Sequence, residues 1–421
     1  MLNIAMISYH TCPLAVLGGK NTGGMNVYIH ELTKQLGVSG VHVDVFTRSQ
    51  DDHIPQVLHD LGYGNRVVHI PAGPEVPLSK EELTKHIPQF IDGIRAFQKK
   101  KQIKYDIIHS NYWMSGLAAI PLKIEWQTPL IHMFHTLGIM KNKIARGIDE
   151  FEGDYRINGE KEVIRASDWI IAATPAEKIQ LETLYKEKIK NLAIISPGVD
   201  TSHFYPIPPD EAKAFLGVSP EERIFLFVGR IEPLKGIDTL LRAIGLIKTS
   251  GALECCPHRL AIIGGDPEIS IEDQQSEMSR LQKLCKDIGI EDIVLFLGKQ
   301  GQDTLPYYYS AAEVVVVPSH YESFGMVALE AMACATPVVA SQVGGLAYLI
   351  KDGITGYFVP GNDPAALSDK LVKMIFNPEL REKLGEQAAV YAHTYSWETI
   401  TDQIVKLYFE ALAEKRISHP L

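Results

Sequence analysis

The fold is decided by residues 314–333, which read VVVVPSHYESFGMVALEAMA. The four valines predict a buried parallel strand, because short apolar runs without alternation are typical of strands covered on both faces. The polar turn that follows leads into a helix expected from Met326 to Ala333. A helix that begins directly after a strand points its free N–H groups and positive dipole end at the turn, which suits a phosphate. The stretch therefore predicts an α/β unit with an anion site at the carboxyl end of this strand.

Two carboxylates bracket this predicted site. Glu322 lies in the turn, and Glu330 is expected about two turns into the helix. Because eight residues separate them, we expect them to contact different parts of an extended ligand rather than one another. Taken alone, such a pair is more often a solvated side chain and a helix-terminal charge. Its weight therefore comes from the motifs that surround it.

Composition indicates a globular protein of two domains. With 421 residues the chain exceeds the size of one ordinary core. Its formal net charge of −10 is spread without long blocks of either sign, which argues against a role in binding nucleic acid or anionic membranes. The five cysteines include no C-x-x-C pair, the N-terminus reads as a strand rather than a signal peptide, and no apolar run reaches membrane-spanning length. We therefore expect a cytoplasmic protein without stable membrane insertion, and we leave a homodimer open.

A strand–turn–helix pattern recurs in both halves of the chain. In the first half we expect strands at 4–8, 41–47, 66–70, 105–110, 130–134 and 169–173. In the second half we expect them at 224–228, 260–263, 294–297, 314–317, 337–340 and 355–359. Pro197 and Gly198 punctuate the chain between the halves. The pattern predicts two doubly wound α/β domains, 1–197 and 198–396, with a last helix at about 397–421 that packs back on the first domain.

Glycine-rich and basic turns lie at several of the predicted strand ends. Gly23 and Gly24 precede a helical stretch and can bring backbone N–H groups against an anion, although a flexible surface loop explains them equally well. Arg230 and Lys235 follow a strand of the second half. Two fixed cations and a helix dipole would hold a diphosphate without a divalent ion. The sequence therefore predicts an anion site and no metal site.

The combination resembles the family 4 retaining glycosyltransferases of the GT-B fold, over essentially the whole chain. The resemblance is carried by the E-x7-E element from Glu322 to Glu330 and by the GR…KG element at 229–236. It implies two Rossmann-like domains that face a central cleft and bind a UDP-sugar. Within the family, residues 10–14 and 23–28 look most like the inositol-phosphate N-acetylglucosaminyltransferase of mycothiol synthesis. Residues 77–83 and 156–157 resemble both that enzyme and bacterial sucrose-phosphate synthase.

The resemblance also implies a role for each residue that matches the family's motifs. The catalytic group would be His135, Arg230, Lys235 and Glu322. The donor-binding group would be Gly23, Gly24, Arg230, Lys235, Glu322, Phe324, Gly325, Met326 and Glu330. The acceptor-binding group, chiefly for a phosphate, would be Asn26, Lys80, Tyr112, Thr136 and Arg156. In this scheme Glu322 holds the donor sugar's hydroxyls, Glu330 holds the ribose, and His135 lies near the anomeric carbon.

The implied reaction is transfer with retention, in which the departing UDP phosphate accepts the acceptor's proton. It requires no cofactor, and Mg²⁺ would be at most stimulatory. The motifs favour an inositol phosphate as acceptor, whereas 28 lysines against 13 arginines indicate a low-GC genome, unlike the actinobacteria that make mycothiol. On that ground we favour UDP-glucose and fructose 6-phosphate, giving sucrose 6-phosphate, with UDP-GlcNAc and inositol phosphate as the alternative. A nucleotide-sugar epimerase and a non-catalytic UDP-sugar binding protein are the rivals from other classes.

Overall fold

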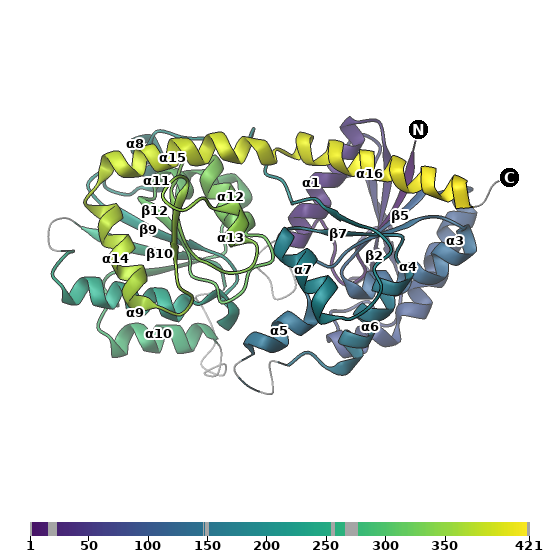
Figure 1. The fold of residues 1–421 in the computed structure, drawn as a ribbon, viewed down its shortest axis with the longest axis horizontal. Coiled ribbons are helices and arrows are strands. Elements are labelled where there is room, and N and C mark those ends of the chain that lie inside the picture. Colours follow the sequence, from purple (N-terminus) through teal and green to yellow (C-terminus); the bar gives the residue numbers. More distant parts are fainter. Residues whose placement is uncertain are drawn as a thin grey trace. The chain divides into compact units, whose positions relative to one another are not determined.

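The chain folds into two compact units, shown in a computed structural model (Figure 1). The structure describes residues 2–15, 23–145, 147, 151–253, 257–265 and 277–418. Unit 1 holds the described residues up to Pro197 together with the last helix, which begins at Trp397. Unit 2 holds Gly198–Ser396.

Unit 1 is built on an eight-stranded sheet in the order β3-β4-β2-β1-β5-β6-β7-β8. All neighbouring strands are parallel except β3, which pairs antiparallel with β4 at the edge. Strand order reverses between β1 and β5, the place where ligands of such sheets bind. The strands are β1 (Asn3–Ile7), β2 (His42–Arg48), β3 (Val57–Leu58), β4 (Arg66–Ile70), β5 (Ile107–Asn111), β6 (Leu130–Met133), β7 (Trp169–Ala172) and β8 (Leu192–Ile194).

Helices cover both faces of this sheet. On one face α3 and α6 pack against α4, and elsewhere in the unit α16 lies along α1 (Figure 1). The rings of Tyr28 and Trp397 lie 5.7 Å apart, and the Tyr408 hydroxyl lies 2.7 Å from His109 Nδ1, which fastens the last helix to this unit. The helices are α1 (Gly24–Val38), α2 (Lys80–Lys85), α3 (Ile87–Lys101), α4 (Trp113–Trp126), α5 (Gly138–Ile144), α6 (Asp154–Ala166), α7 (Pro175–Leu184) and α16 (Trp397–Ser418).

Unit 2 repeats the scheme with a six-stranded, fully parallel sheet in the order β11-β10-β9-β12-β13-β14. Its strands are β9 (Arg223–Val228), β10 (His258–Ile263), β11 (Val294–Gly298), β12 (Val314–Val317), β13 (Val338–Ser341) and β14 (Gly356–Val359). Helices α9 (Ile237–Thr249), α10 (Glu277–Asp287) and α14 (Pro364–Ile375) pack as one group. Helices α8 (Pro209–Leu216), α11 (Leu305–Ala311), α12 (Met326–Ala333) and α15 (Pro378–Ala392) form a second group, and α13 (Leu346–Leu349) packs on β13.

The predicted fold class is confirmed: each unit is a Rossmann-like α/β layer around a parallel sheet. The strands expected at 66–70 and 314–317 have those bounds, and the others differ by one or two residues at their ends. These strands could be predicted because both sheets are covered on both faces, which gives short, continuous apolar runs. All four valines of β12, for example, are at most 6% exposed. Strand β3 was not expected, because two residues carry no periodicity. Within the described residues no helix combines the length and apolarity that a bilayer crossing needs.

Candidate active site

In unit 2 a predicted cation and a predicted carboxylate meet directly. The turns that leave β9 and β12 are neighbours at the point where strand order reverses. Lys235 Nζ lies 2.6 Å from Glu322 Oε2, and the two side chains are 19% and 17% exposed. Arg230 lies on the same turn but pairs with Glu232, at 2.7 Å, and is 33% exposed. The structure thus brings Lys235 and Glu322 together and leaves Arg230 at the rim with its own counter-ion.

A glycine allows the two turns to approach so closely. Gly236 has φ +63°, and a Cβ atom placed on it would lie 2.1 Å from the carbonyl oxygen of Pro318. The backbone N–H of His320 donates to the carbonyl of Leu234 at 2.9 Å, so main chain meets main chain at this point. A side chain at position 236 would push the Lys235 turn away from the Glu322 turn.

Helix α12 starts where the sequence predicted, at Met326, with Gly325 as its cap at φ +111°. No side chain caps this terminus, so the first N–H groups point into the turn as an anion would require. The ring of Phe324 is 4% exposed and packs 5.9 Å from that of Tyr395, so Phe324 can offer a ligand its backbone rather than its ring.

Glu330 lies deeper than its expected role suggests. We expected it about two turns into the helix, but α12 begins only four residues earlier, so it lies just over one turn in. Its Oε2 accepts a 2.6 Å hydrogen bond from the Tyr309 hydroxyl, and the residue is 7% exposed. Burial raises the pKa of this carboxyl to about 7, against a smaller lowering by the Tyr309 hydrogen bond.

In unit 1 the predicted acceptor residues Tyr112, Thr136 and Arg156 form one cluster. The Arg156 side chain is fully buried, and its Nη2 donates to the backbone carbonyl and hydroxyl of Thr136 at 3.0 and 3.1 Å. The Arg156 guanidinium lies over the Tyr112 ring at 5.1 Å. Arg156 Nε donates to Glu160 at 2.9 Å, and Glu160 is itself fully buried. Arg156 is therefore a fixed, desolvated cation beside the carboxyl ends of β5 and β6.

Two lysines lie beside Arg156 because they form ion pairs with the same carboxylate, that of Glu152. Glu152 Oε1 lies 2.6 Å from Arg156 Nη1, 3.0 Å from Lys141 Nζ and 3.5 Å from Lys80 Nζ. Lys80 is the first residue of α2 and follows the Ser79 cap. We refer to Lys80, Lys141 and Arg156 as the cation cluster. It gathers three positive charges around one carboxylate oxygen.

The backbone is strained where β5 and β6 end. Tyr112 has φ +73° and His135 has φ +60°, both in the region that non-glycine residues rarely adopt. His135 Nε2 lies 2.8 Å from Asn111 Oδ1, so Nε2 carries the proton and Nδ1 is left as an acceptor. Burial lowers the pKa of His135 to about 3, with smaller contributions from His109 and His10, so the imidazole is neutral near pH 7. Strain held in two neighbouring turns is typical of a functional site.

The glycine loop before α1 is organised by Asn26. The Gly23 N–H donates to Asn26 Oδ1 at 3.0 Å, and Gly24 is the first residue of the helix. The Asn26 amide donates to the Thr11 hydroxyl at 2.8 Å and to the Cys12 carbonyl at 2.7 Å. All polar atoms of Asn26 are thereby used inside the protein, and the residue is 1% exposed. Asn26 holds the two loops together, which places it behind the predicted site. Gly18 and Gly19, which belong to the same expected loop, lie outside the described residues.

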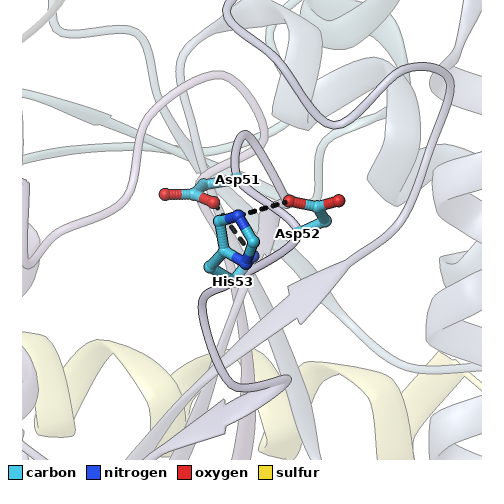
Figure 2. A group of neighbouring side chains, drawn as sticks. All are labelled: Asp51, Asp52 and His53. Carbon is cyan, nitrogen blue, oxygen red and sulfur yellow. Dashed lines mark hydrogen bonds and ion pairs between the residues drawn. The ribbon is translucent and has the colours of Figure 1, made fainter.

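One group in the described part of the chain has the composition of a metal site. Figure 2 shows Asp51, Asp52 and His53 on the turn between β2 and β3. Their ligand atoms lie within 4.8 Å of one another, but all three residues are exposed, and the His53 and Asp52 side chains are 93% and 75% exposed. The His53 N–H donates to Asp51 at 2.9 Å, which is an ordinary local turn contact. None of these residues belongs to the predicted site.

Four residues that shape the unit 1 site were given no role in it from the sequence. Glu152 and Glu160 flank Arg156 at four residues on either side, a spacing that allows ion pairs but does not reveal their burial. His10 packs its ring 4.4 Å from Tyr112, and Asn111 orients His135. Both follow predicted strands, so their position at a strand end was the one available signal.

The two units offer different chemistry. Unit 2 presents Lys235, Arg230 and a helix start, which suit a diphosphate, beside carboxylates that suit hydroxyl groups. Unit 1 presents the cation cluster, which suits a second, smaller phosphate, beside a neutral histidine.

Comparison with known proteins relates both units to glycosyl transfer. Residues 22–203 match the model described as Glycosyltransferase Family 4, and residues 209–390 match Glycosyl transferases group 1. Among solved structures, sucrose-phosphate synthase from Thermosynechococcus elongatus superposes with a TM-score of 0.89 at 34% identity, over 98% of this chain and 100% of that one. Anabaena HepE in complex with UDP-glucose superposes with a TM-score of 0.73 at 18% identity, over 97% of this chain and 100% of that one, a likeness of fold alone.

Curated relatives extend over nearly the whole chain. The D-inositol 3-phosphate glycosyltransferase of Saccharomonospora viridis is 40% identical over 419 residues, which cover 98% of this chain and 95% of that protein. The protein of the same description from Actinosynnema mirum is 38% identical over 416 residues, 98% of each chain. The chain therefore belongs to the family 4 glycosyltransferases of the GT-B fold.

Proposed function

We propose that this glycosyltransferase moves a sugar from a UDP-sugar to an inositol phosphate, with retention at the anomeric carbon. The observation that carries the proposal is the cation cluster of unit 1. Arg156 is fully buried and fixed on Thr136, Glu160 and Glu152, and Lys80 and Lys141 converge on the same carboxylate oxygen. A site that holds three cations around one oxygen anion suits the phosphate of a small acceptor.

The donor would bind to unit 2. Lys235, Arg230 and the free N–H groups at the start of α12 would hold the diphosphate, and Glu322 would accept hydrogen bonds from the sugar's hydroxyls. Glu330 would hold the ribose, for which its neighbour Tyr309 orients one oxygen. HepE, which shares this fold, has been solved with UDP and with UDP-glucose, and this supports a uridine nucleotide as the proposed donor. The proposed donor sugar is N-acetylglucosamine, with glucose as the alternative.

Catalysis would rest on stabilising the departing diphosphate. As the bond between the anomeric carbon and the β-phosphate oxygen breaks, negative charge grows on the β-phosphate, where Lys235 and Arg230 would neutralise it. The acceptor hydroxyl oxygen would form the new bond to the anomeric carbon on the same face of the sugar, and its proton would pass to the departing phosphate oxygen. His135, neutral near pH 7, would contribute a hydrogen bond rather than a positive charge. No step of this scheme requires a metal ion.

The comparisons support inositol phosphate over fructose 6-phosphate, the acceptor preferred from composition. Relatives named for inositol 3-phosphate reach 40% identity, whereas the sucrose-phosphate synthase is 34% identical. The lysine-to-arginine ratio reflects the base composition of a genome and carries no information about a pocket. Fructose 6-phosphate remains the second candidate because of the 0.89 TM-score with that synthase.

A matrix of donors and acceptors tests the proposal. UDP-GlcNAc and UDP-glucose are each combined with D-inositol 3-phosphate, fructose 6-phosphate and unphosphorylated inositol, and released UDP is measured. We expect release only with a phosphorylated acceptor, and fastest with inositol phosphate. UDP release at the same rate with and without an acceptor would indicate hydrolysis of the donor, and binding of UDP-sugar without net UDP release in any combination would indicate a sensor or an epimerase. Either result would refute the proposal.

A further inference from the structure

The carboxylate at the centre of the cation cluster has no role in the proposed transfer. Glu152 Oε1 takes an ion pair from each of the three cations, at 2.6, 3.0 and 3.5 Å. A phosphate oxygen that contacted all three nitrogens in these positions would compete with this atom for the same donors.

Glu152 is also held in place by a contact that does not involve charge. Its backbone N–H donates to Asn142 Oδ1 at 2.7 Å, and its carbonyl accepts from the Asn142 amide at 3.0 Å. Asn142 lies on α5, next to Lys141. The reciprocal pair of hydrogen bonds fixes the main chain at Glu152, so the fold itself holds the carboxylate close to the cations.

Arg156 does not depend on Glu152 for its position. Its Nε is bound by Glu160 and its Nη2 by Thr136, while only Nη1 faces Glu152. The Glu152 side chain is 11% exposed, and those of Lys80 and Lys141 are 34% and 29% exposed. The two lysine side chains are therefore partly exposed, and Arg156 Nη1 is the one guanidinium nitrogen directed at Glu152. An incoming anion could replace Glu152 as the partner of these three groups.

We propose that Glu152 is a built-in stand-in for the acceptor's phosphate, which occupies the cation cluster in the free protein and is displaced when the acceptor binds. The proposal rests on the proposed acceptor-phosphate role of the cluster. Glu152 keeps the three cations neutralised and gathered until a phosphate arrives, and it excludes weaker anions. Its charge persists throughout the useful pH range: burial alone would raise the pKa of Glu152, but attraction to Arg156, Lys80 and Lys141 outweighs burial and lowers it to about 2.

The test measures the binding of inorganic phosphate to the full-length protein by titration calorimetry. Glu152→Gln removes the competing charge while keeping the side chain's size, and we expect phosphate to bind about tenfold more tightly. Asn142→Ala keeps the charge but frees the main chain at Glu152, and we expect a smaller gain of the same sign. Glu81→Gln is the matched control, because it removes one negative charge from an exposed position next to Lys80. Phosphate bound in unit 2 would contribute equally to every variant.

Each outcome decides the question. Tighter binding in both site variants than in Glu81→Gln supports the stand-in. Binding by Glu152→Gln that is no tighter than binding by Glu81→Gln would show a general charge effect and overturn the stand-in. Weaker binding in Glu152→Gln would show that Glu152 assembles the cluster rather than competing for it, and would also overturn it. If Glu152→Gln does not fold, Asn142→Ala decides alone. Tighter phosphate binding combined with no transfer to any phosphorylated acceptor would support the stand-in while refuting the proposed function.

Discussion

The buried ion pair between Arg156 and Glu160 allows a sharp prediction of stability. Both side chains are fully buried, and the Glu160 carboxylate accepts from Arg156 Nε at 2.9 Å, from the Gly138 N–H at 3.0 Å and from the Tyr185 hydroxyl at 2.5 Å. Glu160→Gln keeps the volume but turns one acceptor oxygen into an NH₂ group that must face another donor. It also leaves the Arg156 charge with Glu152 as its one remaining counter-ion. Breaking a buried pair in this way costs about 3–5 kcal/mol.

Tryptophan fluorescence measures this loss in unit 1 alone. All four tryptophans, at 113, 126, 169 and 397, belong to that unit, so their emission reports its unfolding even if unit 2 unfolds separately. With a urea m-value of about 3 kcal/mol/M, a loss of about 3 kcal/mol lowers the midpoint by about 1 M.

The same helix supplies the control for this measurement. Arg165 on α6 pairs with Glu187 at 2.7 Å, but the Arg165 side chain is 58% exposed. Glu187→Gln should leave the midpoint essentially unchanged, because exposed pairs contribute little. If Glu160→Gln shifted the midpoint no further than Glu187→Gln, the buried pair would be energetically neutral, and the reasoning from burial would be wrong.

Three further predictions concern unit 2. Lys235→Ala should lower transfer by about 10²–10³-fold while the urea midpoint is kept, if Lys235 neutralises the departing phosphate; near-normal turnover would contradict its role. Gly236→Ala should abolish transfer, because its Cβ would lie 2.1 Å from the Pro318 carbonyl oxygen. Gly217→Ala is the control, because Gly217 has a similar φ but no atom within 4 Å of the added Cβ. This variant should cost about 1–2 kcal/mol of stability and leave transfer intact. Burial raises the pKa of Glu330 from 4.5 in the unfolded chain to about 7 in the folded protein. The folded protein therefore loses up to about 3 kcal/mol of unfolding free energy as the pH rises from about 4.5 to about 7. Glu330→Gln should therefore gain stability relative to the native chain between pH 4.5 and pH 8 in urea titrations followed by circular dichroism, and an unchanged difference would show that the carboxyl titrates normally.

The fold could be predicted because strands buried on both faces leave a strong signal. Runs such as Val314–Val317 need no context to be assigned, and Ser79 followed three residues later by Glu82 is a typical pattern for the start of a helix such as α2. The Ser79 hydroxyl accepts from the Glu82 N–H at 3.2 Å, as the pattern requires. Local rules of this kind depend on neighbours in the sequence, which is why they could be applied without a structure.

The partners of the site residues could not be predicted, because they depend on which side chains are buried together. Lys235 and Glu322 were expected to bind different parts of a ligand, but the fold brings these two residues, 87 positions apart in the sequence, into direct contact. Asn26 was expected to contact the acceptor, but its amide is used to join two loops. Nothing in the sequence around Arg156 distinguishes a helix surface pair from a buried one, because both need only the four-residue spacing.

Each unit contains cations that are already paired in the free protein. Lys235 is held by Glu322 in unit 2, and the cation cluster is held by Glu152 in unit 1. Such pairing follows from physical chemistry, because several positive charges in a partly desolvated site repel one another unless a carboxylate lies between them. A ligand that bound these cations would compete with an existing ion pair, so its net binding energy would be the difference between two charged contacts. A phosphate would make that exchange favourable through its larger charge and additional oxygens, whereas a neutral sugar would not, and the proposed preference for phosphorylated ligands follows from this difference.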